Sequence, residues 1–496
     1  MEVAWRVAVI LLVSYSSWIS AAKMNTKVLI LGGGAAGIGF AKRLFDKGEK
    51  EFLILEAQSY IGGRLKDTKF GNLTIQEGAG WIHGISKSNS LYLLKQKFGL
   101  AATADNYTDF IVRDLKGNIV PGAMALYKKL RTKTEEMYTV IEKMSAAGEF
   151  DIPLKTALEL VGWRPETPAE KTIDYYFSDF ENESPPWILS AQSVGFTGEG
   201  SDEIVVDTRG LAYLLRETAK NFTSKVKLNT RVKKITYDAN KVTVLAKNGD
   251  TYEADYAYVT FSTGVLVSSM VEFSPPLPHW KTKAAYMLPM GYYTKIFLKF
   301  PTKFWDDNRY ILVASEKRGH YVHFHNLDRS GLFPGEKMLI ATVTDRESVR
   351  VEKLTDAQVK DEVMAVLRQV YPSATTATGI FVSRWSLDNT TFGSYSSPVI
   401  GSDKYTYEDL KAPVNKRLWF GGEAATDSDN FGYAHGAYTF GRKQADELLS
   451  CMSDNAKCPE YKPRKKATCS DASDKLLSVI LALLSMLCSV IFIFTL

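Results

Sequence analysis

The sequence is poor in cysteine. Its 496 residues contain four cysteines, and none lies in the first 450 positions. This distribution excludes a disulfide scaffold for the main body of the chain. Cys451 and Cys458 are close enough in sequence to form a bridge, which would staple the end of the last helix.

The sequence also lacks an excess of charge of one sign. Lys and Arg number 61 against 56 Asp and Glu, so the formal net charge is only +5. The clearest basic cluster, 462–466, lies near the C-terminus and predicts a solvated tail rather than a nucleic-acid-binding surface. We therefore expect no nucleic-acid partner, and we identify no metal site. Tandem repeats and low-complexity segments are absent, and the length allows two or more domains.

Long apolar runs are confined to the two ends. Residues 1–22 resemble a signal peptide, with Arg6, an apolar stretch too short to span a bilayer, and small residues at the cleavage position. Residues 476–496 are uncharged and mostly apolar, and they follow small residues and a polar spacer in the tail 451–475. This order favours a glycosylphosphatidylinositol (GPI) attachment signal, with a retained membrane helix as the alternative.

These two ends predict passage through the secretory pathway to the cell surface or the extracellular space, with attachment to the membrane by a C-terminal lipid anchor or helix. The sequons available for glycosylation on that route are Asn72, Asn106, Asn182, Asn221 and Asn389.

The segment "KVLILGGGAAGIGFAKRL" (27–44) reads as a buried strand, a glycine-rich turn and a helix. Gly32, Gly34 and Gly37 have the G-x-G-x-x-G spacing of a dinucleotide-binding turn, whose helix N-terminus offers free N–H groups to a pyrophosphate. A second strand, "EFLILEA", ends at Glu56, where a carboxylate can bond a ribose hydroxyl. The pattern predicts a bound dinucleotide.

The choice between NAD and FAD depends on the segments "EAQSYIGGRL" (56–65), "EGAGWIHG" (77–84) and "RLWFGGEAATDSDNFGYAHGAYTFGRKQADELL" (417–449), whose resemblance to a known family implies FAD. Together with the paired strands around Asn248-Gly249, they resemble the flavin amine oxidase family over nearly everything between the two ends. In that family the Gly-Gly-Arg turn bends against the pyrophosphate of FAD. The resemblance implies these cofactor-binding residues: Gly32, Gly34, Ala36, Gly37, Glu56, Ala57, Gly63, Arg64, Gly80, Trp81, Val232, Trp385, Glu423, Tyr433 and Ala434.

The same resemblance implies three residues in front of the flavin. Lys295, in the alternating stretch "GYYTKIFLKFPTKFW", matches a lysine that holds a water against the flavin N5. Tyr395 and Tyr433 match the two rings that flank the substrate nitrogen in an aromatic cage. The family links FAD to a cysteine in its monoamine oxidases, but the closing motif here contains none. We expect FAD to be bound non-covalently.

Glu181 and His83 distinguish among amine substrates. The segment "DYYFSDFENESPP" resembles the part of polyamine oxidases that brings a glutamate to the substrate tunnel, and the matching position is Glu181. His83 stands where plant polyamine oxidases have an acid and the animal enzymes a histidine. The competing interpretation of Glu181 is a solvated loop acid, because Asn182 beside it heads a sequon.

We therefore predict an α/β protein with a discontinuous, Rossmann-like FAD-binding domain (26–100, 222–290 and 396–450). An α+β substrate-binding domain on a mixed sheet would comprise 101–221 and 291–395. The predicted function is FAD-dependent oxidation of a polyamine such as spermine, spermidine or an acetylated form, with oxygen as the electron acceptor, by a monomeric enzyme. An L-amino-acid or monoamine oxidase on the same fold is the alternative. A flavoprotein fold kept only as a binding module is disfavoured, because the predicted cofactor and cage residues are all present.

Overall fold

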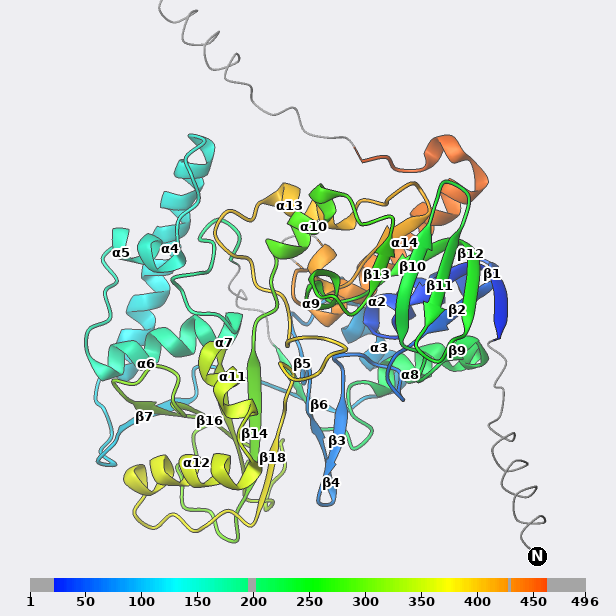
Figure 1. Ribbon diagram of the computed structural model, residues 1–496. Coiled ribbons are helices and arrows are strands. Elements are labelled where there is room, and N and C mark those ends of the chain that lie inside the picture. Colours follow the sequence, from blue (N-terminus) through cyan, green and yellow to red (C-terminus); the bar gives the residue numbers. More distant parts are fainter. Residues whose placement is uncertain (1–21, 195–201, 427–429, 462–496) are drawn as a thin grey trace, which may run out of the picture. The chain divides into compact units, whose positions relative to one another are not determined.

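The computed structural model describes residues 22–194, 202–426 and 430–461. It is a mixed α/β structure, which confirms the predicted fold class (Figure 1). Residues 1–21 of the predicted signal peptide and the apolar C-terminal segment lie outside the described residues. Within the described ranges, no helix has the length and apolar character needed to cross a bilayer.

The largest sheet has a parallel centre built from apolar strands. Strand β1 (Lys23–Leu31) pairs in parallel with both β2 (Phe52–Leu55) and β12 (Thr251–Val259). Strand β1 begins earlier than the predicted position 27, because its first residues continue the pairing with β12 beyond the buried core. The remaining strands of this sheet are β9 (Val226–Lys227), β10 (Val232–Tyr237), β11 (Val242–Ala246), β13 (Glu272–Ser274) and β19 (Leu418–Phe420). Strands β11 and β12 form the hairpin predicted at Asn248-Gly249.

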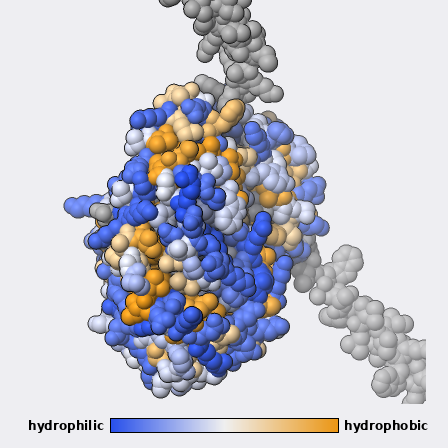
Figure 2. Space-filling view, turned by 90° about the vertical axis from the view of Figure 1, so that its left-hand side faces the viewer, coloured by the Kyte–Doolittle hydropathy of each residue, from blue (hydrophilic) through white to orange (hydrophobic). Residues whose placement is uncertain are grey.

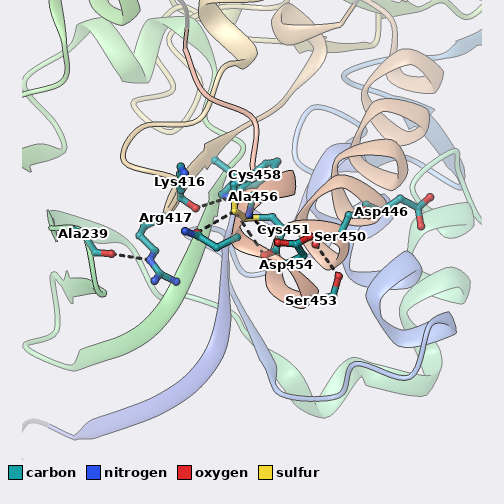
Figure 3. The surroundings of a disulfide bond; sticks show 12 residues. Ala239, Lys416, Arg417, Asp446, Ser450, Cys451, Ser453, Asp454, Ala456 and Cys458 are labelled. Atoms are coloured by element: carbon teal, nitrogen blue, oxygen red, sulfur yellow. Dashed lines mark hydrogen bonds between the residues drawn. A yellow bond between two sulfur atoms is a disulfide. The ribbon is translucent and has the colours of Figure 1, made fainter.

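Two helices from opposite ends of the chain pack closely beside this sheet. Helix α2 (Ala35–Asp46) and helix α14 (Ala434–Ser453) begin at the predicted positions. A Cβ at Gly441 would lie 2.2 Å from the carbonyl oxygen of Ala36, so glycine allows the two backbones to touch. Figure 3 shows the predicted Cys451–Cys458 disulfide, which joins the last turn of α14 to the residue after η4 (Asn455–Lys457).

The second large sheet has six strands, and its two faces are different. Its order is β18 (Gly379–Val382), β14 (Tyr293–Lys299), β17 (Met338–Thr344), β16 (His323–Asn326), β15 (Tyr310–Ala314) and β7 (Phe110–Asp114). One face packs on α12 (Asp356–Val370) through an apolar cluster that includes Ile296 and Val363. The opposite face carries Tyr293, Lys295 and Phe297, because side chains alternate along β14. Helix α12 opens with the predicted Thr355/Gln358 capping box.

Smaller elements complete the described chain. A three-stranded sheet has the order β5 (Trp81–Ile82), β8 (Glu203–Val205) and β6 (Ala102–Ala104), and β3 (Asp67–Phe70) pairs with β4 (Leu73–Gln76). The helices are α3 (Ser90–Phe98), α4 (Ala123–Ala146), α5 (Leu154–Leu160), α6 (Pro168–Phe177), α7 (Asp179–Asn182), α8 (Tyr213–Ala219), η1 (Lys220–Lys225), α9 (Thr263–Val267), α10 (His279–Tyr286), α11 (Asp345–Glu352), α13 (Lys404–Lys411) and η2 (Glu423–Ala425).

Candidate active site

A cavity of about 1210 Å³ lies where the predicted site residues converge. All the predicted cofactor-binding residues line it except Gly37, and so do all the residues predicted to meet the substrate. Gly37 instead packs against the turn, where a Cβ would lie only 2.0 Å from the carbonyl oxygen of Gly32. This contact is the close helix-to-strand packing expected of the third glycine.

One end of the cavity has the features of a dinucleotide cradle. Helix α2 begins there with no side-chain cap and no acidic residue in its first turn, so its N–H groups are open to an anion. Glu56 follows β2 and is buried. Its carboxylate accepts hydrogen bonds from the backbone N–H groups of Gly33 (2.6 Å) and Gln58 (2.7 Å). Burial raises the pKa of Glu56, while these backbone hydrogen bonds lower it.

Arg64 and Glu423 form an ion pair in the wall of the cavity, with Glu423 buried and Arg64 partly buried. The Nη1 group of Arg64 donates to Oε1 of Glu423 at 2.8 Å, and the hydroxyl of Ser396 donates to the same oxygen at 2.8 Å. The second carboxylate oxygen of Glu423 is buried and has no partner within the described part of the chain. A buried acceptor of this kind calls for a donor from a bound group, such as a ribityl hydroxyl.

Lys295 is a fully enclosed amine. Its Nζ donates to the carbonyl oxygens of Gly78 and Gln76 (3.2 Å for Gln76), and it lies 4.9 Å from the centroid of the Trp81 ring. Burial lowers the pKa of Lys295 to about 7, against an opposing effect of the Glu77 carboxylate. The side chain can therefore hold or release a proton near neutral pH.

Tyrosine side chains line the same cavity as Lys295. Tyr395 donates its hydroxyl to the backbone carbonyl of Glu181 at 2.9 Å, and its ring centroid lies 6.4 Å from that of Tyr293. Tyr433 immediately precedes α14, and its ring centroid lies 5.0 Å from that of His83. Burial raises the pKa of both predicted cage tyrosines, so they remain neutral phenols.

Glu181 lies on α7 and lines the cavity, where it is half-buried. Its charge contributes to raising the pKa values of His83, Tyr395 and Tyr433, which line the same cavity. Asn182 lines the cavity as well, and Ser184 of the same sequon is buried. A glycan on Asn182 would have to occupy the cavity, which argues against the solvated-loop interpretation of Glu181.

Several residues of the site had no distinct sequence signal. Asp202 and Tyr107 line the cavity beside His83, although each stands among other polar residues in a segment that contains no motif. Tyr293 shares a strand face with Lys295, so strand alternation could have found it.

Comparison with known proteins agrees with this geometry. Residues 35–449 match the model of a protein family described as flavin containing amine oxidoreductase. Polyamine oxidase 1 of Zea mays is 34% identical over 465 residues, covering 87% of this chain and 92% of the relative. Polyamine oxidase 6 of Oryza sativa subsp. japonica is 33% identical, with 86% and 91% covered. A putrescine oxidase solved with bound putrescine shares the fold, with a TM-score of 0.72 at 19% identity, covering 86% of this chain and 100% of that chain.

The residues present fit a flavin dinucleotide. The glycine turn, the uncapped start of α2 and Glu56 suit the adenosine and pyrophosphate portion. The unpaired oxygen of Glu423 and the enclosed amine of Lys295 line the same cavity. On this geometry and the family match, the chain belongs to the flavin-containing amine oxidoreductases and its cofactor is FAD.

Proposed function

We propose that this enzyme oxidises polyamines such as spermine, spermidine or their acetylated forms. The observation that carries the proposal is the position of Glu181. Its carboxylate lines the same cavity as Lys295 and the two cage tyrosines, where a second, distant ammonium group could meet it. The names of the maize and rice relatives support the same substrate class.

The reaction consumes a secondary amine, oxygen and water, and gives an aldehyde, a shorter amine and hydrogen peroxide. When bound, FAD supplies the oxidation, by accepting a hydride from the carbon next to the amine nitrogen and passing the electrons to oxygen. Tyr395 and Tyr433 hold the amine, and their neutral rings accept either its charged or its uncharged form. Lys295 positions water and takes up a proton, because its pKa of about 7 allows both protonation states.

An L-amino-acid oxidase would need a cation for the substrate carboxylate. Among the described residues that line the cavity, Arg64 is the only arginine, and Glu423 already pairs with it. This arrangement favours an amine without a carboxylate.

Replacing Glu181 with glutamine tests the proposal. The Michaelis constant for spermine should rise roughly ten- to a hundredfold with a smaller change in kcat, since a charge-assisted hydrogen bond worth roughly 1.5–3 kcal/mol is lost from both the ground and transition states. A short monoamine has no distal charge, so its kinetics should hardly change. Glu166→Gln, at an exposed position ahead of α6, is the matched control. Equal weakening of both substrates, or of neither, would contradict the proposal.

The protein's ends support a location at the cell surface. Residues 1–22 have the pattern of a secretory signal, and 476–496 that of a GPI attachment signal. Asn72, Asn106, Asn221 and Asn389 are exposed in the structure and available as glycosylation sites. We place the enzyme outside the cell, tethered by lipid and acting as a monomer.

A further inference from the structure

The short three-stranded sheet brings three distant polar residues into one row. Ile82 of β5 and Ala104 of β6 both lie opposite Glu203 of β8. The next position on each strand is therefore His83, Asp105 and Asp202, respectively. A hydrogen bond from the backbone N–H of Asp105 to the carbonyl of Asp202 (2.7 Å) continues this register.

Asp202 is held rigidly, and it holds His83. Its carboxylate is buried, with 2% of the side chain exposed. One oxygen accepts the backbone N–H of Gly84 at 2.9 Å. The other lies 2.7 Å from Nδ1 of His83 and accepts the hydroxyl of Tyr107 at 3.1 Å. The backbone carbonyl of His83 is in turn fixed by the side-chain amide of Asn89.

These contacts determine which nitrogen of His83 meets the cavity. Because Asp202 is an acceptor only, Nδ1 of His83 must carry a proton to bond to it. Nε2 is left for the cavity, which His83 lines beside Tyr433. A carboxylate behind an imidazole is a common way to fix its tautomer and orientation.

We propose that Asp202 is a positioning residue for His83, fixing the imidazole so that Nε2 is presented to an amine nitrogen of the substrate. The inference deepens the proposed function, because it assigns the polar contact of one substrate nitrogen to the His83–Asp202 pair. Tyr107 weakens the hydrogen bond between Asp202 and His83, because its hydroxyl donates to the same carboxylate oxygen.

Titratable groups from the three-stranded sheet, α7 and α14 act on His83 or respond to its charge. Burial acts to lower the pKa of His83, but the hydrogen bond to and charge of Asp202 raise it above its ordinary value, with smaller contributions from Glu181 on α7 and Asp105 after β6. Burial acts to raise the pKa of Asp202, but the hydrogen bond and charge of His83, together with the hydrogen bonds from Gly84 and Tyr107, lower it below its ordinary value. On the side of α14, burial and the charge of His83 lower the pKa of His435 to about 4, and Tyr433 is a neutral phenol.

The role of Nε2 then depends on pH in a defined direction. Below the raised pKa, both nitrogens of His83 are donors. Above it, Nδ1 keeps its proton for Asp202 and Nε2 becomes an acceptor for an N–H group of the amine. Use of a polyamine should therefore improve as the pH rises through the pKa of His83.

Asp202→Asn tests this inference in the FAD-loaded enzyme. NMR titration of histidine-labelled protein without substrate should show the pKa of His83 falling by about one unit or more, because the charge that stabilises the imidazolium is gone. The spectrum of His83→Asn assigns the signal. Tyr107→Phe should move the same pKa upward, since it frees the shared oxygen of Asp202. A structural role for Asp202 alone would not produce opposite shifts.

Kinetics complete the test. In Asp202→Asn, the acidic limb of kcat/KM for spermine should move to lower pH, and in the His83→Asn background the substitution should cause no further movement. An unchanged pKa of His83 in both Asp202→Asn and Tyr107→Phe would overturn the inference. The titration contains no substrate, so its outcome is independent of whether polyamines are the substrates. If Asp202→Asn loses FAD absorbance, the pKa of His83 in Tyr107→Phe still decides: an upward shift supports the inference, and an unchanged value overturns it.

Discussion

Lys295 is a buried amine surrounded by carbonyl oxygens and an indole ring. The carboxylate whose charge acts on it, Glu77, is already paired with Lys66 at 3.0 Å. A lysine in this setting lowers stability below about pH 7, because the folded state must then bury an ammonium group. The cost is relieved as the pH rises toward the ordinary pKa of lysine.

Lys295→Met should retain FAD, since methionine fills the space without a charge. Turnover of spermine should fall by about a hundredfold, the usual scale of a positioned acid–base group. In the wild type, kcat should rise with pH through about 7, and this inflection should be absent from the variant. Stopped-flow reduction and a pH series of steady-state rates measure both effects.

Lys299→Met is the matched control, because Lys299 lies on the same strand but pairs with Glu336 at the surface. Wild-type turnover in Lys295→Met would assign Lys295 a structural role only.

Residues inside contiguous motifs could be predicted from the sequence, and isolated ones could not. Gly32 and Glu56 belong to stretches whose spacing carries a physical requirement, and Tyr433 belongs to a motif that resembles the flavin amine oxidases; each lines the cavity. Asp202 is a single acid that meets His83 only through the pairing of three strands far apart in the chain. Local patterns contain no information about such a meeting.

Helices and strands also differ in how well the local sequence predicts them. Helix α12 was predictable, because its capping box and apolar spacing are local and both are present in the structure. Strands β5, β6 and β8 have only two or three residues each, too few for a period-2 pattern to be recognised. These short strands build the wall that carries His83, so the part of the site with the least sequence signal rests on the shortest elements.

Helix α13 ends on a buried lysine from another helix. Lys281 of α10 is fully buried, and its Nζ donates to three backbone carbonyls at the end of α13, those of Asp409, Leu410 and Ala412. These carbonyls have no further residue in their own helix to bond to, so the lysine replaces a C-cap.

Lys281→Met should lower the free energy of unfolding by roughly 3 kcal/mol, because several buried carbonyl groups lose their donor at once. Urea unfolding followed by circular dichroism measures the loss, and Lys283→Met on the exposed side of the same helix is the control. Equal stability of the two variants would mean that water replaces the lysine. The KM for spermine should be unchanged, since Lys281 does not line the cavity.

At the scale of the whole molecule, the surface is charged and interrupted by apolar patches. Figure 2 shows this mixture on one face, and Phe150, in the loop between α4 and α5, is the most exposed large apolar side chain of the described residues, at 93%.

The strands of the eight-stranded sheet come from 23–55, 226–274 and 418–420, while those of the six-stranded sheet come from 110–114 and 293–382. The domain boundaries remain a prediction, because motifs locate segments but not their limits.

Treatment of cells with a phospholipase tests how the whole enzyme is attached to the membrane. If the enzyme is tethered by GPI, a phosphatidylinositol-specific phospholipase should release most of the spermine-oxidising activity from cells that display it. Release should be measured in the supernatant beside a known anchored protein. Activity that stays with the cells while the reference protein is released would favour a membrane helix formed by 476–496.

The contact between α2 and α14 has a consequence for the order of events during synthesis. The glycine turn emerges from the ribosome first, whereas Glu423 and the helix that packs on α2 are among the last parts of the described chain to emerge. A nascent chain that stops before β19 lacks both the partner of Arg64 and the helix against which Gly39 and Gly441 allow close packing. The cofactor cradle is therefore complete only after α14 has emerged, and premature termination upstream of Leu418 leaves a polypeptide without a complete cradle.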